Sequence, residues 1–187
     1  METNEKTNLY LVGYMGTGKT TVGKLLAKKM HRSFIDMDEF IESRYRKTIA
    51  AIFEEKGEID FREIEHRSLQ EVSAFEKVVV STGGGLPCFF DNMDLLNRTG
   101  ITIYLRASAN ELVDRLTVDM QKRPLVKGKN TEELRDFVET SLKKRELFYN
   151  QAQLIFDVCH CSSKKKMEQW IDELFIHIKN KIVTNEN

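Results

Sequence analysis

Five short apolar runs recur along the chain, and a longer helical pattern follows each of them. Polar or turn residues bound each run, and β-branched side chains are frequent in it, as is typical of short buried strands. Strands that alternate with helices form parallel sheets. The pattern predicts an α/β fold in which helices flank a parallel sheet, with strands at Leu9 to Val12, Phe34 to Ile35, Val78 to Val80, Ile101 to Leu105 and Leu154 to Val158.

The segments after these runs have the periodicity of amphipathic helices. The first carries apolar residues at the spacing i, i+3, i+4, i+8, namely Val22, Leu25, Leu26 and Met30. Ser108 precedes Glu111 by three residues, a capping-box spacing that predicts a helix start there. We expect a last helix from about Ser162, with an apolar face formed by Met167, Trp170, Ile171, Leu174 and Ile178.

The composition is that of an ordinary globular protein of 187 residues, about one domain in length. Hydrophobic residues make up 41%, and 29 basic residues balance 29 acidic ones. A nucleic-acid partner is not predicted, because such binding needs a basic excess or patch. No apolar run approaches membrane-spanning length, and the first residues lack the basic start and apolar stretch of a signal peptide. We therefore expect a cytoplasmic protein without membrane association.

The three cysteines, Cys88, Cys159 and Cys161, do not indicate a disulfide framework, because their number is odd. Cys159, His160 and Cys161 form a triplet that resembles a fragment of a metal site. A zinc site needs four ligands in suitably spaced pairs, however. We therefore favour surface or strand-end cysteines over metal binding.

The segment GYMGTGKT, residues 13–20, matches the phosphate-binding pattern G-x-x-x-x-G-K-[ST]. A predicted strand precedes it and a predicted amphipathic helix follows, which is the context that the pattern requires. Its glycines let backbone N–H groups and the helix N-terminus converge on phosphate oxygens. Lys19 is expected to reach the β- and γ-phosphates, and the Thr20 hydroxyl to coordinate Mg²⁺. A glycine-rich turn without a ligand is a much weaker alternative.

The reaction class follows from what accompanies this loop. A GTPase would need a base-reading N-K-x-D segment, which the sequence lacks. A small-molecule kinase is the best class. Asp36 and Asp38 end the second predicted strand, where residues i and i+2 would share a face at the ligand-binding edge of the sheet. One carboxylate near Mg²⁺ and one near an acceptor hydroxyl suits phosphoryl transfer, although a polar strand end with a helix cap is the alternative.

Three further segments carry candidate chemistry. Arg62 lies in a charged helical stretch, where a surface ion pair with Glu58 or Glu65 is the plain alternative. Three glycines, Gly83 to Gly85, follow the third strand, which suggests either a close approach to the backbone or a tight turn. The polar, basic stretch TVDMQKRPLVKGKN, residues 117–130, is expected to be a mobile loop over a site or a solvated connection.

The chain resembles the shikimate kinase family. The resemblance runs from Gly13 through Tyr149 and rests on the ordered motifs GYMGTGKT, DMD, DFREIE, VVSTGGG, KRPLV and KKRELFY. It implies the fold of nucleoside monophosphate kinases, with a five-stranded parallel sheet and a mobile lid. It also implies transfer of the γ-phosphate of ATP to the 3-hydroxyl of shikimate, on the way to chorismate and the aromatic amino acids. One domain over residues 1–187 would hold a lid at about 117–130 and a substrate-binding helical region at about 39–73.

The resemblance also implies roles for individual residues. Asp38 would contact the acceptor hydroxyls and act as base, and Asp36 would be the outer carboxylate of the single magnesium site with Thr20. Arg123 would be the lid arginine that closes over the transferred phosphate. The nucleotide would be held by Gly16, Thr17, Gly18, Lys19, Thr20, Thr21, Arg115 and Arg123, and shikimate by Asp38, Arg62, Gly83, Gly84, Gly85 and Arg145. Glu146 departs from the family, in which proline is common after the substrate arginine.

Two other functions stay open at this point. Gluconate kinase and similar enzymes share the phosphate loop and an acidic pair, whereas the pair Arg62 and Arg145 with the glycine triplet favours shikimate. A degenerate kinase that binds ATP and regulates a partner is disfavoured by the intact Lys19, Asp38 and Arg123. We expect ATP and shikimate as substrates, Mg²⁺ as cofactor and a monomer, since no long exposed apolar stripe stands out.

Overall fold

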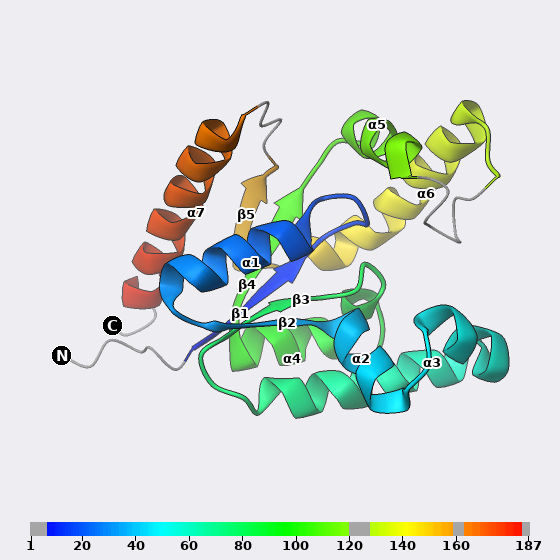
Figure 1. Ribbon diagram of the computed structural model, residues 1–187, viewed down its shortest axis with the longest axis horizontal. Helices are drawn as coiled ribbons and strands as arrows, with labels where there is room; N and C mark the ends of the chain where they lie inside the picture. Colours follow the sequence, from blue (N-terminus) through cyan, green and yellow to red (C-terminus); the bar gives the residue numbers. More distant parts are fainter. Residues whose placement is uncertain (1–6, 120–127, 159–162, 185–187) are drawn as a thin grey trace.

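The structure, a computed structural model, describes residues 7–119, 128–158 and 163–184. Its centre is a sheet of five strands, and every neighbouring pair is parallel (Figure 1). The order is β2-β3-β1-β4-β5, which confirms the predicted α/β class. The strands are β1 (Asn8–Val12), β2 (Ser33–Asp36), β3 (Val78–Ser81), β4 (Gly100–Arg106) and β5 (Leu154–Asp157), so each apolar run of the sequence became a strand.

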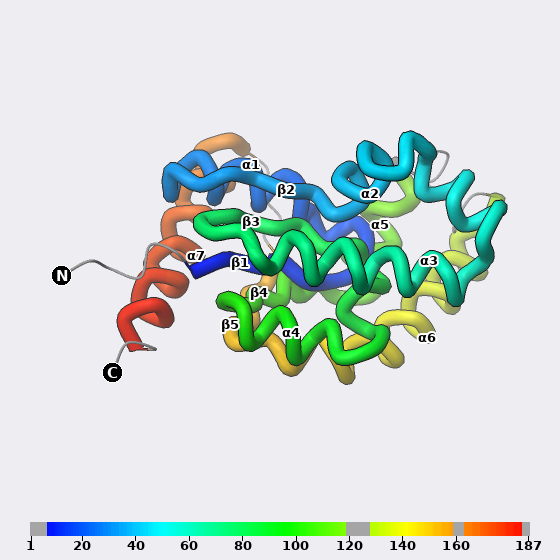
Figure 2. Tube along the Cα trace, turned by 90° about the horizontal axis from the view of Figure 1, so that it is seen from below, coloured from blue at the N-terminus to red at the C-terminus, as the bar shows by residue number. Residues whose placement is uncertain are grey.

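Helices cover both faces of this sheet. Alternate residues of the central strand β1 enter two different apolar clusters, because successive strand side chains point to opposite faces. Leu9 and Leu11 pack with α1 (Lys19–Met30) and α7 (Lys164–Thr184). Tyr10 and Val12 pack on the other side with α3 (Ile49–Ser73), α4 (Asn92–Thr99), α5 (Ala109–Asp119) and α6 (Thr131–Tyr149). Figure 2 shows α3 and α4 running side by side.

The predicted helices are present, but the exposure of one residue and the extent of one predicted loop differ from expectation. The capping box forms, since the Ser108 backbone N–H donates to Glu111 Oε2 at 2.6 Å. Leu25, expected in the apolar stripe of α1, is instead 39% exposed. The stretch 117–130 is not a loop from its start, because α5 continues to Asp119, and Asn130 already caps α6. Residues 120–127 of that stretch lie outside the described residues.

A small extension is built by α2 (Met37–Tyr45) and the first half of α3. It has its own apolar cluster of Ile41, Ile52, Phe61 and Ile64, and it lies beyond the carboxyl ends of the strands in Figure 1. Gly57 interrupts α3 with φ 78° and ψ 178°, a backbone conformation that suits glycine. The extension covers the first part of the region expected at 39–73, and the role of that region in substrate binding stays a prediction. Among the described helices none is both long and apolar enough to cross a membrane.

Candidate active site

The glycine-rich loop connects β1 to α1 at the carboxyl edge of the sheet. Gly16 and Gly18 have φ values of 87° and 91°, which residues with a Cβ rarely adopt. Thr17 is buried, and its hydroxyl donates to the Tyr14 carbonyl at 2.9 Å. The loop is therefore held from inside by the side chain of Thr17. A glycine-rich loop at a helix N-terminus is the kind of arrangement that binds anions through backbone N–H groups, and its role in holding phosphate stays a prediction.

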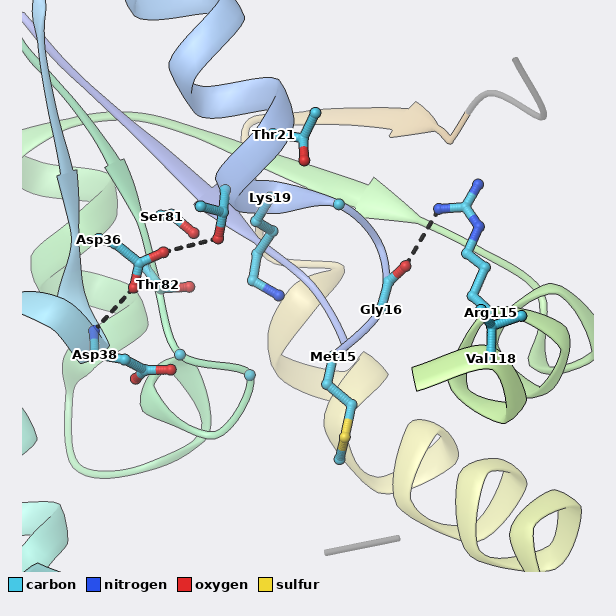
Figure 3. A pocket seen from close by; sticks show the side chains of 14 residues that line it. Met15, Gly16, Lys19, Thr21, Asp36, Asp38, Ser81, Thr82, Arg115 and Val118 are labelled. Carbon is cyan, nitrogen blue, oxygen red and sulfur yellow. Dashed lines mark hydrogen bonds between the residues drawn. The ribbon is translucent and has the colours of Figure 1, made fainter. Parts of the chain in front are cut away.

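Lys19 is the first residue of α1 and is only 8% exposed. Its Nζ donates to the carbonyl oxygens of Gly13 and Tyr14 at 2.8 and 2.9 Å. Figure 3 shows the amine turned across the mouth of the loop, toward the cavity between the loop and Asp38. A buried ammonium in this position places a full positive charge where phosphate oxygens would be bound.

Asp36 and Asp38 are both at the cavity, but the predicted reason for this was wrong. The strand β2 ends at Asp36, and Asp38 lies in the first turn of α2 rather than on an extended strand. Asp36 caps that helix, since its Oδ1 accepts from the Asp38 backbone N–H at 3.1 Å. Its Oδ2 accepts from the Thr20 hydroxyl at 2.8 Å. The helix cap that the sequence left as an alternative is therefore real, and it brings a carboxylate to the end of the phosphate loop.

These groups surround one cavity of about 530 Å³. The phosphate loop forms one wall, the two aspartates and the end of β3 a second, and α5 a third (Figure 3). The lining residues are Met15, Gly16, Gly18, Lys19, Thr20, Thr21, Asp36, Asp38, Ser81, Thr82, Gly83, Gly84, Arg115 and Val118. Most of the residues expected to hold a nucleotide thus share a single space with the expected base.

Asp38 is an exposed residue whose carboxyl group faces this cavity. Protein atoms around the cavity desolvate this carboxyl group in part, and this desolvation, reinforced by the negative charges of Asp36 and Glu42, raises its pKa above the ordinary value. Lys19 and Arg62 act in the opposite direction. A carboxylate with a raised pKa accepts a proton more readily than a fully hydrated one, which suits a general base.

Arg62 does not line the cavity itself but lies next to it, against the glycine triplet. Its Nη1 is 2.6 Å from Glu65 Oε2 and its Nη2 is 3.1 Å from Glu58 Oε1, so both ion pairs considered from the sequence exist. The pair with Glu65 is not a surface feature, since the Arg62 and Glu65 side chains are 12% and 3% exposed, whereas Glu58 is 56% exposed. The Arg62 Cζ also lies 4.2 Å from the centre of the Phe89 ring. A Cβ on Gly85 would come within 2.6 Å of Nη1.

Arg145 of α6 approaches the same triplet from the other side. A Cβ on Gly84 would lie 3.4 Å from Arg145 Nη1 and 3.4 Å from the Met15 backbone N. The Tyr149 hydroxyl donates to the Gly84 carbonyl and holds the triplet in place. Both arginines therefore lie beside the glycines, and Arg145 is half-buried.

Glu65 is a site residue that the sequence pointed to only as an ion-pair partner. It is 3% exposed, and this burial raises its pKa to about 7, against the lowering effect of Arg62. A Cβ on Gly83 would lie 3.2 Å from Glu65 Oε1 and 3.1 Å from Asp38 Oδ1. The two carboxylates thus approach the same glycine. The motif DFREIE contained the signal, because Glu65 follows Arg62 by three residues on one helix face.

Arg115 lies across the phosphate loop, where its Nη1 donates to the carbonyl oxygens of Gly16 and Thr17 at 3.3 Å. Arg115 therefore lies beside the loop residues that are expected to hold the nucleotide. Arg123 and the triplet Cys159, His160 and Cys161 lie outside the described residues. Among the residues that the structure does describe, no cluster of three or more His, Cys, Asp or Glu side chains could hold a metal ion.

Comparison with known proteins decides between the kinase classes. The family model described as shikimate kinase matches residues 15–179. This chain belongs to the shikimate kinase family. A shikimate kinase of Parabacteroides distasonis is 55% identical over 149 residues, which cover 80% of this chain and 86% of that protein.

Two solved structures of shikimate kinases resemble this one throughout. The crystal structure of the enzyme from Bacteroides thetaiotaomicron has a TM-score of 0.87 at 46% identity, covering 90% of this chain and 96% of that one. The enzyme from Acinetobacter baumannii, solved in complex with shikimate, has a TM-score of 0.79 at 33% identity, covering 97% of this chain and 96% of that one. The five-stranded fold expected from the resemblance is confirmed, and a gluconate kinase or a regulatory ATP-binding protein is not favoured.

Proposed function

We propose that this shikimate kinase transfers the γ-phosphate of ATP to the 3-hydroxyl of shikimate, with Lys19 on the phosphate side and Asp38 on the acceptor side. The observation that carries the proposal is the shared cavity, into which a phosphate-binding loop and a carboxylate of raised pKa both open. In-line transfer needs the acceptor oxygen and the γ-phosphate in one water-poor space. The shikimate complex of the related Acinetobacter enzyme supports the acceptor.

The acceptor is oriented by its carboxylate in this proposal. Arg62 and Arg145 flank the glycine triplet, and planar guanidinium groups bind carboxylates through paired, charge-assisted hydrogen bonds. The Arg62 Nε is buried without a hydrogen-bond partner among the described residues, which leaves one donor of this side chain unused by Glu58 and Glu65. With the carboxylate bound there, the opposite hydroxyls of the ring point toward Asp38. Gly83 and Gly84 supply the space for the ring.

Asp38 then removes the proton from the attacking hydroxyl. Lys19 neutralises the charge that develops on the phosphoryl oxygens, and the N–H groups from Gly16 to Thr21 hold the β-phosphate in place. Arg115 lies on the nucleotide side of the loop. Arg123 is proposed to close over the transferred phosphate, as the resemblance implies.

Mg²⁺ fits the residues at the end of the phosphate loop. The Thr20 hydroxyl and Asp36 Oδ2 are 2.8 Å apart, and the Ser81 and Thr82 side chains lie beside them in the cavity wall. Oxygen donors of this kind suit Mg²⁺, which keeps several waters and takes its remaining ligands from phosphates. The ion would offset charge on the β- and γ-phosphates. A monomer in the cytoplasm stays a prediction from the sequence.

The test compares ADP release from Mg·ATP with shikimate, gluconate, nucleoside monophosphates and no acceptor. We expect turnover that depends on shikimate and is reduced at least about 100-fold in Asp38→Asn, which keeps the shape but lacks the base. Affinity for ATP, measured by titration calorimetry, should stay close to that of the unmodified enzyme. Turnover with gluconate or a nucleotide in place of shikimate would contradict the acceptor. Loss of ATP binding in the variant would contradict the role of Asp38.

A further inference from the structure

Tyr14 belongs to the phosphate loop, and its side chain packs in the apolar core. The residue is fully buried. Its carbonyl oxygen accepts from Lys19 Nζ at 2.9 Å and from the Thr17 hydroxyl at 2.9 Å. The backbone carbonyl of Tyr14 is therefore part of the cradle that would hold the phosphates.

The ring of Tyr14 lies against α6. It shares an apolar cluster with Leu134, Val138 and Leu142 of that helix. The Cζ of Arg145, one turn further along, lies 5.2 Å from the ring centre, within the range of a cation–π contact. The acceptor-side arginine thus rests on an aromatic ring that the nucleotide-side loop supplies.

Gly84 lies between the phosphate loop and Arg145. A Cβ at this position would meet both Arg145 Nη1 and the Met15 backbone N at 3.4 Å. The phosphate loop and Arg145 therefore both lie close to Gly84, with room for little more than a methyl group between them. Three segments far apart in the sequence are packed as one unit, and packed units of this kind transmit displacements.

We propose that Tyr14 is a positioning residue that couples the two substrate sites, so that the loop conformation that binds ATP also fixes Arg145 for the carboxylate of the acceptor. The proposal rests on the function given above. Coupling between sites is reciprocal, so bound nucleotide should tighten shikimate binding by the same factor by which shikimate tightens nucleotide binding. The ring carries the effect, because its face contacts the guanidinium. The hydroxyl lies next to Ser141 but makes no hydrogen bond of acceptable geometry to a described residue.

The experiment measures this coupling by titration calorimetry. The dissociation constant of shikimate is determined with and without a non-hydrolysable ATP analogue and Mg²⁺. Four variants are compared with the unmodified chain. Tyr14→Leu removes the ring, Tyr14→Met removes it while filling more of the space, and Tyr14→Phe keeps it. Tyr10→Leu is the matched control, since Tyr10 is equally buried but bonds to Thr99 at the far end of the strand.

We expect the analogue to tighten shikimate binding at least about 5-fold in the unmodified chain. In Tyr14→Leu and Tyr14→Met, shikimate should bind about 3- to 30-fold more weakly in the presence of the analogue, and the coupling factor should fall toward one. The analogue alone should bind within about 3-fold of normal. Tyr14→Phe should keep the coupling. Tyr10→Leu should lower the melting temperature and leave the coupling factor unchanged.

Other results would overturn the proposal. A coupling factor of one in the unmodified chain would contradict it. Full coupling in a ring-less variant that folds would also contradict it. Loss of coupling in Tyr14→Phe or in Tyr10→Leu would be a third contradiction. If neither ring-less variant folds, the ring is a core element and the coupling role is rejected. A chain that binds the analogue but does not bind shikimate in any state would instead contradict the proposed function.

Discussion

The substitution Gly85→Ala tests the acceptor site with a single methyl group. A Cβ at this position would lie 2.6 Å from Arg62 Nη1 and 3.0 Å from both Cζ and Nη2. The backbone itself accepts alanine, because φ is −90° and ψ is −31°. The guanidinium must therefore retreat by roughly 0.8 Å to reach an ordinary contact distance of 3.4 Å. Phe89 on one face and the ion pairs to Glu65 and Glu58 leave it little room to do so without losing alignment.

We expect Gly85→Ala to weaken the binding of shikimate and to leave the stability of the fold nearly unchanged. Misaligning one charge-assisted hydrogen bond to the acceptor carboxylate costs about 1.5–3 kcal/mol. This corresponds to an increase of about 10- to 150-fold in the KM for shikimate. Steady-state ADP release at varied shikimate and saturating Mg·ATP measures it, and the KM for ATP should change by less than about 3-fold. A thermal melt should change little, because the tip of a long side chain can move aside.

Gly100→Ala is the matched control, also a methyl group added to a crowded glycine. Here the Cβ would lie 2.4 Å from the backbone oxygen of Asn8 in the neighbouring strand, which cannot move aside as a side chain can. We expect a loss of about 1–3 kcal/mol of unfolding free energy and an unchanged KM for shikimate. A normal KM for shikimate in Gly85→Ala would refute the assignment of Arg62 to the acceptor. A raised KM in both variants would show that general destabilisation is the cause.

Two further predictions concern charged groups of the site. Lys19→Met should lower kcat by several orders of magnitude while circular dichroism shows a retained fold, because the cation at the transferred phosphate is lost; near-normal turnover would contradict this role. Glu65 should ionise as the pH rises through about 7, which adds a negative charge beside Arg62 and raises the KM for shikimate; Glu65→Gln should remove this step from the pH profile. Because the folded-state pKa lies above the ordinary 4.5, the free energy of unfolding should also fall as the pH rises from about 4.5 to about 7, and this slope should be smaller in Glu65→Gln. Equal pH profiles in the two proteins would contradict the assignment.

The features that the sequence determined are local ones. Each of the five strands is a short apolar run between polar residues, and such runs that alternate with helices form a helix-flanked parallel sheet. The phosphate loop is equally local, because the positive φ values at Gly16 and Gly18 are a property of glycine at those positions. Family motifs then supplied the candidate residues Arg62 and Arg145, which no periodicity would have singled out.

Tertiary structure decided which groups meet and what their surroundings do to them. The sequence predicted that Asp38 lies at the cavity, but it did not predict that Asp38 lies in a helix. The strand β2 ends before Asp38 because Asp36 caps α2 and accepts a hydrogen bond from Thr20 of another helix. The pKa of Glu65 depends on burial between α3 and the glycine triplet. Desolvation and charge–charge interactions arise from neighbours in space, and these are set by packing between segments far apart in the chain.

The same reason explains Tyr14. In the sequence it is an unremarked position of the phosphate-binding pattern, at which any residue is allowed. Only the packing of α6 against the loop brings Arg145 onto its ring. A pattern of residues specifies the backbone that a loop adopts, whereas the partner of a side chain pointing away from that loop is chosen by the assembled core.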